Sequence, residues 1–69
     1  MEDINETVRK NIYRLRKEKG LTQEGLAHAA GLHRAYIGQI ERGEKKIGLT
    51  NLQKLAVALN IPITDFFED

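Results

Sequence analysis

The sequence predicts an all-α fold, a compact five-helix bundle with a helix-turn-helix unit at about residues 22–42. Apolar residues recur at helical spacing through residues 4–15. Two successive short helical runs each end on a glycine, at Gly31 and at Gly43. No segment alternates apolar and polar residues as a strand does. We therefore expect helices throughout.

The first predicted helix runs from about Asp3 or Asn5 to Lys19. Its apolar residues form a single stripe, made by Ile4, Val8, Ile12 and Leu15. Gly20 follows directly and can adopt the left-handed conformation that often ends a helix. The stripe predicts one buried face.

Two short helices come next. Thr22 is the expected N-cap of the first, which ends at Gly31, and the second spans about His33 to Arg42. Helices that cross over a turn of about three or four residues must approach closely, so the small Ala27 is expected at the crossing. Four apolar residues should lie buried beneath this unit: Leu26, Leu32, Ile37 and Ile40.

The last two helices are marked by caps and by a proline. The fourth is predicted to begin after Thr50 as N-cap and to run to about Asn60, a plausible left-handed terminator. Pro62 prevents its continuation. Thr64 should then cap a short fifth helix over residues 65–68.

The composition limits what kind of protein this is. Sixty-nine residues make one small domain, 1–69, whose core is small enough that association would add stability. The chain has no cysteine, and no apolar run approaches the roughly 20 residues of a membrane span. Its acidic, amphipathic N-terminus, beginning at Met1, does not resemble a signal peptide. We expect a cytoplasmic protein that has no membrane partner.

The net charge is only +1, but the charges are unevenly distributed. Residues 9–19 hold six basic side chains and one acidic one, and residues 34–46 hold four basic and two acidic. Acidic residues gather at both ends of the chain. This pattern is compatible with a one-sided phosphate-binding face, and equally with an ordinary solvated surface.

The central motif resembles the Cro/phage-repressor (XRE-type) helix-turn-helix family, over roughly residues 6–67. The resemblance rests on these residues: Leu21-Thr22-Gln23-Glu24, Leu26-Ala27, Gly31-Leu32, Tyr36-Ile37, Gln39-Ile40-Glu41-Arg42-Gly43 and Leu52-x-x-Leu55-Ala56-x-Ala58-Leu59. It implies a lambda-repressor-like DNA-binding domain. The short length and the run from Gly31 to Ile37 look most like one subgroup, the controller proteins of restriction–modification systems. Gly25 and His33 depart from the commonest family pattern, which has Glu and Ser or Thr there.

Three residues of the second short helix are candidates for reading bases. With Ile37 facing inward, Ala35 and Gln39 lie on the opposite side, and Arg34 stands at the end that enters the groove. Arg34 can bridge the O6/N7 edge of guanine, Gln39 can bridge the N6/N7 edge of adenine, and Ala35 can meet a thymine methyl. All three map onto base-contacting positions of the resembling family. The alternative is a solvated helix face.

Seven further residues are candidates for the DNA backbone or have uncertain roles: Gln23, His33, Tyr36, Arg42, Lys45, Lys46 and Asn51. The resemblance implies that Gln23 bonds a phosphate at the start of its helix. Tyr36 either donates to a phosphate or packs its ring on the fourth helix. His33 either reaches the DNA or caps its helix.

Two pairs of residues are assigned to structure and to assembly. The resemblance implies a largely buried ion pair between Arg16 and Glu41. Phe66 and Phe67 are adjacent and must point in different directions, so one can fill the core while the other is left for a second subunit. We place them at a dimer interface.

These residues together predict a sequence-specific, double-stranded-DNA-binding transcriptional regulator. It would act as a homodimer on a roughly palindromic operator and either occlude RNA polymerase or contact it. The alternative is a protein-binding module, such as an antitoxin or anti-repressor. No catalytic constellation and no third ligand near His28 and His33 is evident, so we expect no enzyme activity, no metal and no cofactor.

Overall fold

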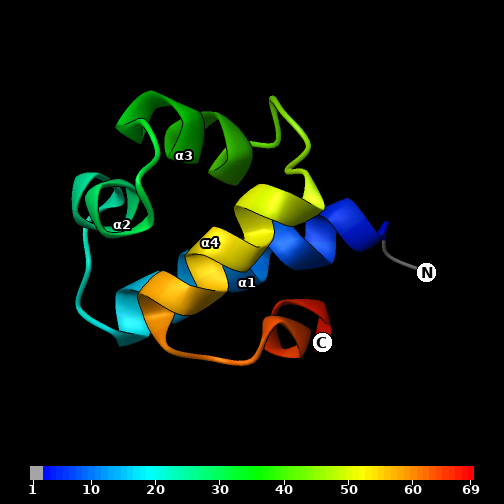
Figure 1. Ribbon diagram of the computed structural model, residues 1–69. Coiled ribbons are helices and arrows are strands. Elements are labelled where there is room, and N and C mark those ends of the chain that lie inside the picture. The colour runs from blue at the N-terminus through cyan, green and yellow to red at the C-terminus, as the bar shows by residue number, and fades with distance from the viewer. Residues whose placement is uncertain (1–2) are drawn as a thin grey trace.

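The computed structural model describes residues 3–69. Met1 and Glu2 lie outside the described residues. The prediction that the N-terminus is not a signal peptide therefore falls partly outside them. Residues 3–69 form four α-helices and a final 3-10 helix and contain no strand; Figure 1 shows how these elements are arranged. Their bounds are α1 Ile4–Glu18, α2 Gln23–Ala30, α3 Arg34–Glu41, α4 Leu49–Leu59 and η1 Ile63–Phe67. None of the helices in this range is both long enough and apolar enough to cross a bilayer.

Helix α1 begins where the sequence predicts it. The Asp3 carboxylate accepts a hydrogen bond from the Asn5 N–H at 2.7 Å, which caps the helix and lowers the pKa of Asp3. The helix ends at Glu18 with Lys19 as its C-cap, and Gly20 follows with φ of 74°. Asn11, on the buried side of α1, donates through Nδ2 to the Phe66 carbonyl at 2.8 Å and also to the Glu68 carbonyl. Asn11 therefore ties α1 to η1.

The helix-turn-helix is formed by α2, α3 and the turn between them. Thr22 caps α2, because its Oγ1 accepts from the Gly25 N–H at 2.9 Å. Gly31 adopts the left-handed conformation, with φ of 70°, and the Leu32 N–H then returns to the Ala27 carbonyl at 2.8 Å. These bonds end α2 abruptly and turn the chain into α3.

A single hydrophobic core lies between the helices. It is formed by Val8, Ile12, Leu15, Leu26, Ala27, Ile37, Ile40, Leu52, Leu55, Ala56, Leu59 and Phe66. Helix α2 packs against both α3 and α4, and α1 packs against α3 and η1. The predicted burial of Leu26, Ile37 and Ile40 is confirmed, and Leu32 is half-buried against the same core.

Two predicted helix starts are wrong. Helix α4 is capped by the backbone of Gly48 and begins at Leu49, so Thr50 lies inside it. The Gly48 carbonyl already accepts the Leu52 N–H at 2.9 Å, which sets the first turn without a side-chain cap. Asn60 does end this helix in the left-handed conformation, with φ of 57°.

The fifth predicted helix is a 3-10 helix, so the described part of the chain has four α-helices and not five. It begins at Ile63, before the expected Thr64 cap, because Pro62 occupies the N-cap position. Proline has a fixed φ and no N–H, and the Pro62 carbonyl accepts the Asp65 N–H at 3.0 Å. The short turn brings Phe66 into the core with no exposed surface.

Candidate nucleic-acid interface

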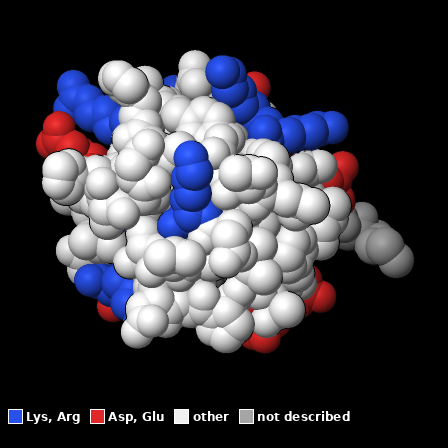
Figure 2. All heavy atoms as spheres, viewed as in Figure 1, with Lys and Arg blue, Asp and Glu red and all other residues white. Residues whose placement is uncertain are grey.

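Helix α3 presents one apolar and one polar side. Ile37, Gly38 and Ile40 are buried, whereas Arg34, Ala35 and Arg42 are exposed and Gln39 is half-buried. The three candidate base readers therefore lie away from the core. Figure 1 shows α3 along an outer edge of the molecule, and in Figure 2 basic side chains gather along that edge with acidic side chains beside them.

The N-terminal end of α3 meets α2 across a shallow hollow of about 300 Å³. The hollow is lined by Glu24, Ala27, His28, Leu32, His33 and Arg34. Arg34 Nη1 lies 3.6 Å from the Glu24 carboxylate, and both side chains are largely exposed. His33 is the N-cap residue of α3, as its alternative role predicts, but it caps through its backbone carbonyl and makes no side-chain capping bond. Within residues 3–69 no three His, Cys, Asp or Glu side chains are grouped to hold a metal.

Tyr36 is fixed by α4. Its ring is half-buried against the core, and its hydroxyl accepts a hydrogen bond from Asn51 Nδ2 at 3.1 Å. Of the two roles expected for Tyr36, this arrangement matches the one in which its ring packs on the fourth helix. The bond leaves the hydroxyl hydrogen of Tyr36 available to another acceptor, because Asn51 is the donor. The sequence singled out Asn51 as a phosphate contact, and the structure gives it the additional task of holding the tyrosine.

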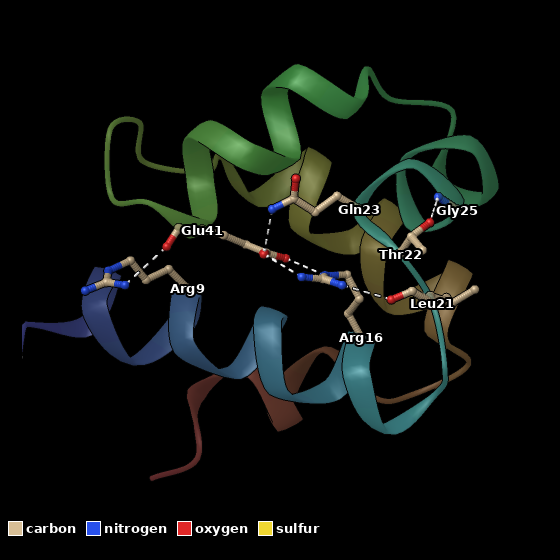
Figure 3. Close-up of polar contacts among 7 residues, drawn as sticks. All are labelled: Arg9, Arg16, Leu21, Thr22, Gln23, Gly25 and Glu41. Carbon is tan, nitrogen blue, oxygen red and sulfur yellow. Dashed lines mark hydrogen bonds and ion pairs between the residues drawn. The ribbon is translucent and has the colours of Figure 1, made fainter.

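The buried Arg16–Glu41 pair is present and forms the centre of a polar network (Figure 3). Arg16 donates through Nε and Nη2 to the two Glu41 oxygens at 2.8 and 2.9 Å, and through Nη1 to the Leu21 carbonyl at 2.9 Å. Their side chains are only 8% and 5% exposed. The hydrogen bonds from Arg16 to Glu41 raise the pKa of the Arg16 guanidinium. The network joins α1, α3 and Leu21, which lies two residues before α2.

Gln23 is the third member of this network. Its Nε2 donates to Glu41 Oε1 at 3.0 Å, so the side chain expected to bond a phosphate is held by the end of α3. A second N–H remains on the same nitrogen. Arg9 adds a contact that the sequence did not reveal: its Nη1 donates to the backbone carbonyl of Glu41 at 3.2 Å, while its guanidinium pairs with Glu6. The end of α3 is thus fixed from both α1 and α2.

A second, exposed ion pair lies just beyond α3. Arg42 donates through Nε and Nη2 to the two oxygens of Glu44 at 2.7 and 3.2 Å. These bonds raise the pKa of Arg42 and lower the pKa of Glu44. Lys45 and Lys46, the other basic candidates of this loop, are exposed. Sequence reasoning assigned Arg42 to the DNA backbone and overlooked Glu44, although it stands only two residues away.

The two phenylalanines have different environments. Phe66 is completely buried within one copy of the chain, whereas Phe67 is 39% exposed. Phe66 therefore cannot reach a second subunit, and its predicted interface role is wrong. Of the two predicted residues, Phe67 is the one still available to an interface. Leu49 and Val57 on α4, which the sequence analysis did not name, are also exposed, at 72% and 69%.

The fold and this surface define a helix-turn-helix domain, and known proteins agree. Residues 12–66 match the HTH_3 family, described as helix-turn-helix. The control protein C.SmaI of Serratia marcescens is 44% identical over 61 residues, which cover 88% of this chain and 73% of that protein. The control protein C.MunI of Mycoplasma sp is 37% identical over 70 residues, covering 100% of this chain and 95% of that protein.

Solved structures give the same result. The crystal structure of the restriction-modification controller protein C.AhdI from Aeromonas hydrophila matches with a TM-score of 0.87 and 41% sequence identity, covering 91% of this chain and 96% of that one. The chain belongs to the HTH_3 helix-turn-helix family. It is a DNA-binding transcriptional regulator of that family and not an enzyme.

Proposed function

We propose that this regulator is the controller of a restriction–modification system and that it acts as a homodimer on a roughly palindromic operator. The observation that carries the proposal is the likeness to C.SmaI, C.MunI and C.AhdI, which extends over most of both chains in each comparison. Occupancy of promoter DNA would be the regulatory signal.

Base recognition is assigned to Arg34, Ala35 and Gln39. The exposed guanidinium of Arg34 stands at the first turn of α3, the end that enters the major groove first. Its guanidinium can donate two hydrogen bonds to the O6/N7 edge of guanine, and the Gln39 amide can pair with adenine. Ala35 offers a methyl group to thymine. His33, beside Arg34 and exposed, is assigned to the neighbouring base or phosphate.

Backbone contacts are assigned to Gln23 and to a second group of residues that lie on α3 or follow it in the chain. Gln23 lies at the start of α2, where backbone N–H groups also favour an anion. The second group is formed by Tyr36, Arg42, Lys45, Lys46 and Asn51. The Tyr36 hydroxyl, held by Asn51, would donate its hydrogen to a phosphate. The exposed arginine and lysines would contact the phosphates beyond α3.

Dimerisation is assigned to α4 and η1. Three exposed large apolar side chains, Leu49, Val57 and Phe67, belong to these elements, and a second copy would remove them from water. Two-fold pairing there would place the two recognition helices about 34 Å apart, one helical turn of DNA. Occupied promoter DNA would then either exclude RNA polymerase or present the dimer to it.

The operator can be identified by selecting DNA fragments with the purified protein and sequencing them. The proposal expects a two-fold symmetric consensus, located in front of genes for a methyltransferase and a restriction endonuclease. A transcription assay with that promoter would then show whether polymerase is excluded or recruited. A consensus without symmetry would contradict the dimer model, and a symmetric site far from such genes would contradict the controller assignment.

The dimer interface is tested by Phe67→Lys. The variant should stay folded, since Phe67 lies outside the core, but should sediment as a monomer and bind the full operator more weakly. Thr64→Lys, an exposed position of the same 3-10 helix, adds the same charge and is the control. An unchanged dimer in the Phe67 variant would place the interface elsewhere.

A further inference from the structure

All five arginines of the chain lie within ion-pair distance of a carboxylate. The pairs are Arg9–Glu6, Arg14–Glu18, Arg16–Glu41, Arg34–Glu24 and Arg42–Glu44. Two of these arginines, Arg34 and Arg42, stand at the two ends of the proposed DNA-contacting helix. Each therefore already has an acidic partner in the DNA-free protein.

The contact between Arg42 and Glu44 is the more complete of the two. Both oxygens of Glu44 accept hydrogen bonds from the Nε/Nη2 edge of the guanidinium. That is the two-bond geometry in which an arginine grips a phosphate. The remaining nitrogen, Nη1, lies against the helix, 3.0 Å from the position that a Cβ on Gly38 would occupy. The Nε/Nη2 edge of Arg42, which could bind a phosphate with two hydrogen bonds, is therefore occupied by the Glu44 carboxylate.

The position of Glu44 is set by the backbone. Gly43 follows α3 with φ of 77°, and the Glu44 N–H donates to the Gln39 carbonyl at 2.8 Å. This bond returns the chain over the end of α3. The Glu44 carboxylate is consequently carried back to the side chain of Arg42, two residues earlier. The turn that ends α3 therefore also places the Glu44 carboxylate beside Arg42.

We infer that Glu44 is an internal competitor for DNA phosphate: it occupies Arg42 in the free protein and must be displaced when Arg42 grips the DNA backbone. The inference rests on the proposed role of Arg42. Two consequences follow. Displacement leaves a negative charge near the phosphates, so Glu44 lowers affinity for DNA of any sequence. The freed carboxylate also takes up cations, which reduces the net counterion release of binding.

A positioning role for Glu44 predicts the opposite sign. If Glu44 only oriented Arg42 toward the DNA, its removal would weaken binding. The variant Glu44→Gln therefore separates the two roles. It keeps the size of the side chain, and neither partner of the pair belongs to the core.

The probe is a labelled duplex of random sequence, about 20 base pairs or two helical turns long. We expect Glu44→Gln to bind it roughly two- to fivefold more tightly, with a salt dependence steeper by up to about one unit. Glu18→Gln is the matched control. It removes one negative charge from the similarly exposed Arg14–Glu18 pair, and Arg14 also contacts Asn11, the residue that ties α1 to η1. Its gain should be clearly smaller.

The same measurements in an Arg42→Gln background show whether the affinity gain of Glu44→Gln depends on Arg42. Arg42→Gln should weaken binding by itself, and Glu44→Gln should then add no more than Glu18→Gln does. If Arg42→Gln weakens binding but Glu44→Gln gives no gain beyond the control, the inference is overturned and the role of Arg42 stands. If Arg42→Gln leaves binding unchanged, the proposed backbone contact is itself wrong, and the competitor model with it.

Discussion

Glu41 and Glu44 stand three positions apart, and each binds an arginine with both carboxylate oxygens. Glu41 is the last residue of α3, its side chain is 5% exposed, and its partner Arg16 comes from α1. The Glu44 side chain is 54% exposed, and its partner Arg42 is two residues away. One pair therefore connects distant elements away from water, and the other is local and more than half exposed to solvent.

The difference separates stability from ligand exchange. Breaking a buried pair leaves a charge without its partner where water cannot replace it. Breaking an exposed pair costs little, because water and ions solvate both groups and a phosphate can replace the carboxylate. The buried pair is thus suited to holding α3 in place, and the exposed pair is suited to giving way to DNA.

The largest effect is expected from Glu41→Ala. Arg16 would be left buried, losing two of its three hydrogen bonds, and the free energy of unfolding should fall by about 3–5 kcal/mol. In a domain this small, the melting temperature should drop by roughly 12–40 °C. Thermal unfolding followed by circular dichroism measures it. Glu44→Ala should shift the transition by no more than about 3 °C; equal shifts for both variants would erase the comparison.

The next largest effect is expected on operator binding from Arg34→Ala and Gln39→Ala. Each should lose about 1–3 kcal/mol of binding free energy on the preferred site and relax selectivity at one base pair in each half-site. Neither side chain belongs to the core, so stability should be nearly unchanged. Binding to single-base variants of the operator is the measurement. Equal losses on operator and on random DNA would remove both residues from base recognition.

Gln23→Ala tests the residue that connects the buried network to the surface. Stability should fall by about 0.5–1.5 kcal/mol, because Glu41 keeps both bonds from Arg16. Binding should weaken on all sequences, with an unchanged salt slope because the amide is neutral. Titrations of operator and random DNA at several salt concentrations check this. A loss confined to the operator would instead make Gln23 a base-reading residue.

The smallest effect is expected from Glu24→Gln. Glu24 lies 3.6 Å from Arg34, without the two-bond geometry of Glu44, and both side chains are at least 70% exposed. The gain in affinity for random DNA should be under about twofold and smaller than that of Glu44→Gln. A direct comparison of the two variants at low salt provides the measurement. A larger gain from Glu24→Gln would mean that the geometry of the pair does not govern the competition.

Local signals in the sequence were sufficient for most of the fold. Helical spacing of Ile4, Val8, Ile12 and Leu15 predicted α1, and Gly31 predicted the turn that its positive φ permits. The errors fell at helix starts. Thr50 and Thr64 are residues of a type that often caps helices, but Gly48 and Pro62 occupy the N-cap positions. Gly48 does so through a backbone hydrogen bond and Pro62 through its fixed φ, and neither is described by side-chain capping preferences.

The sequence by itself determined the helical pattern, the turn and the polar side of α3, because each depends on residues a few positions apart. It did not determine which phenylalanine is buried, since adjacent side chains are equivalent until η1 packs on α1. Contacts of Arg9 and Gln23 with Glu41 join separate helices and have no local signal. Only the tertiary structure decided these, because burial and hydrogen-bond geometry arise when distant segments meet.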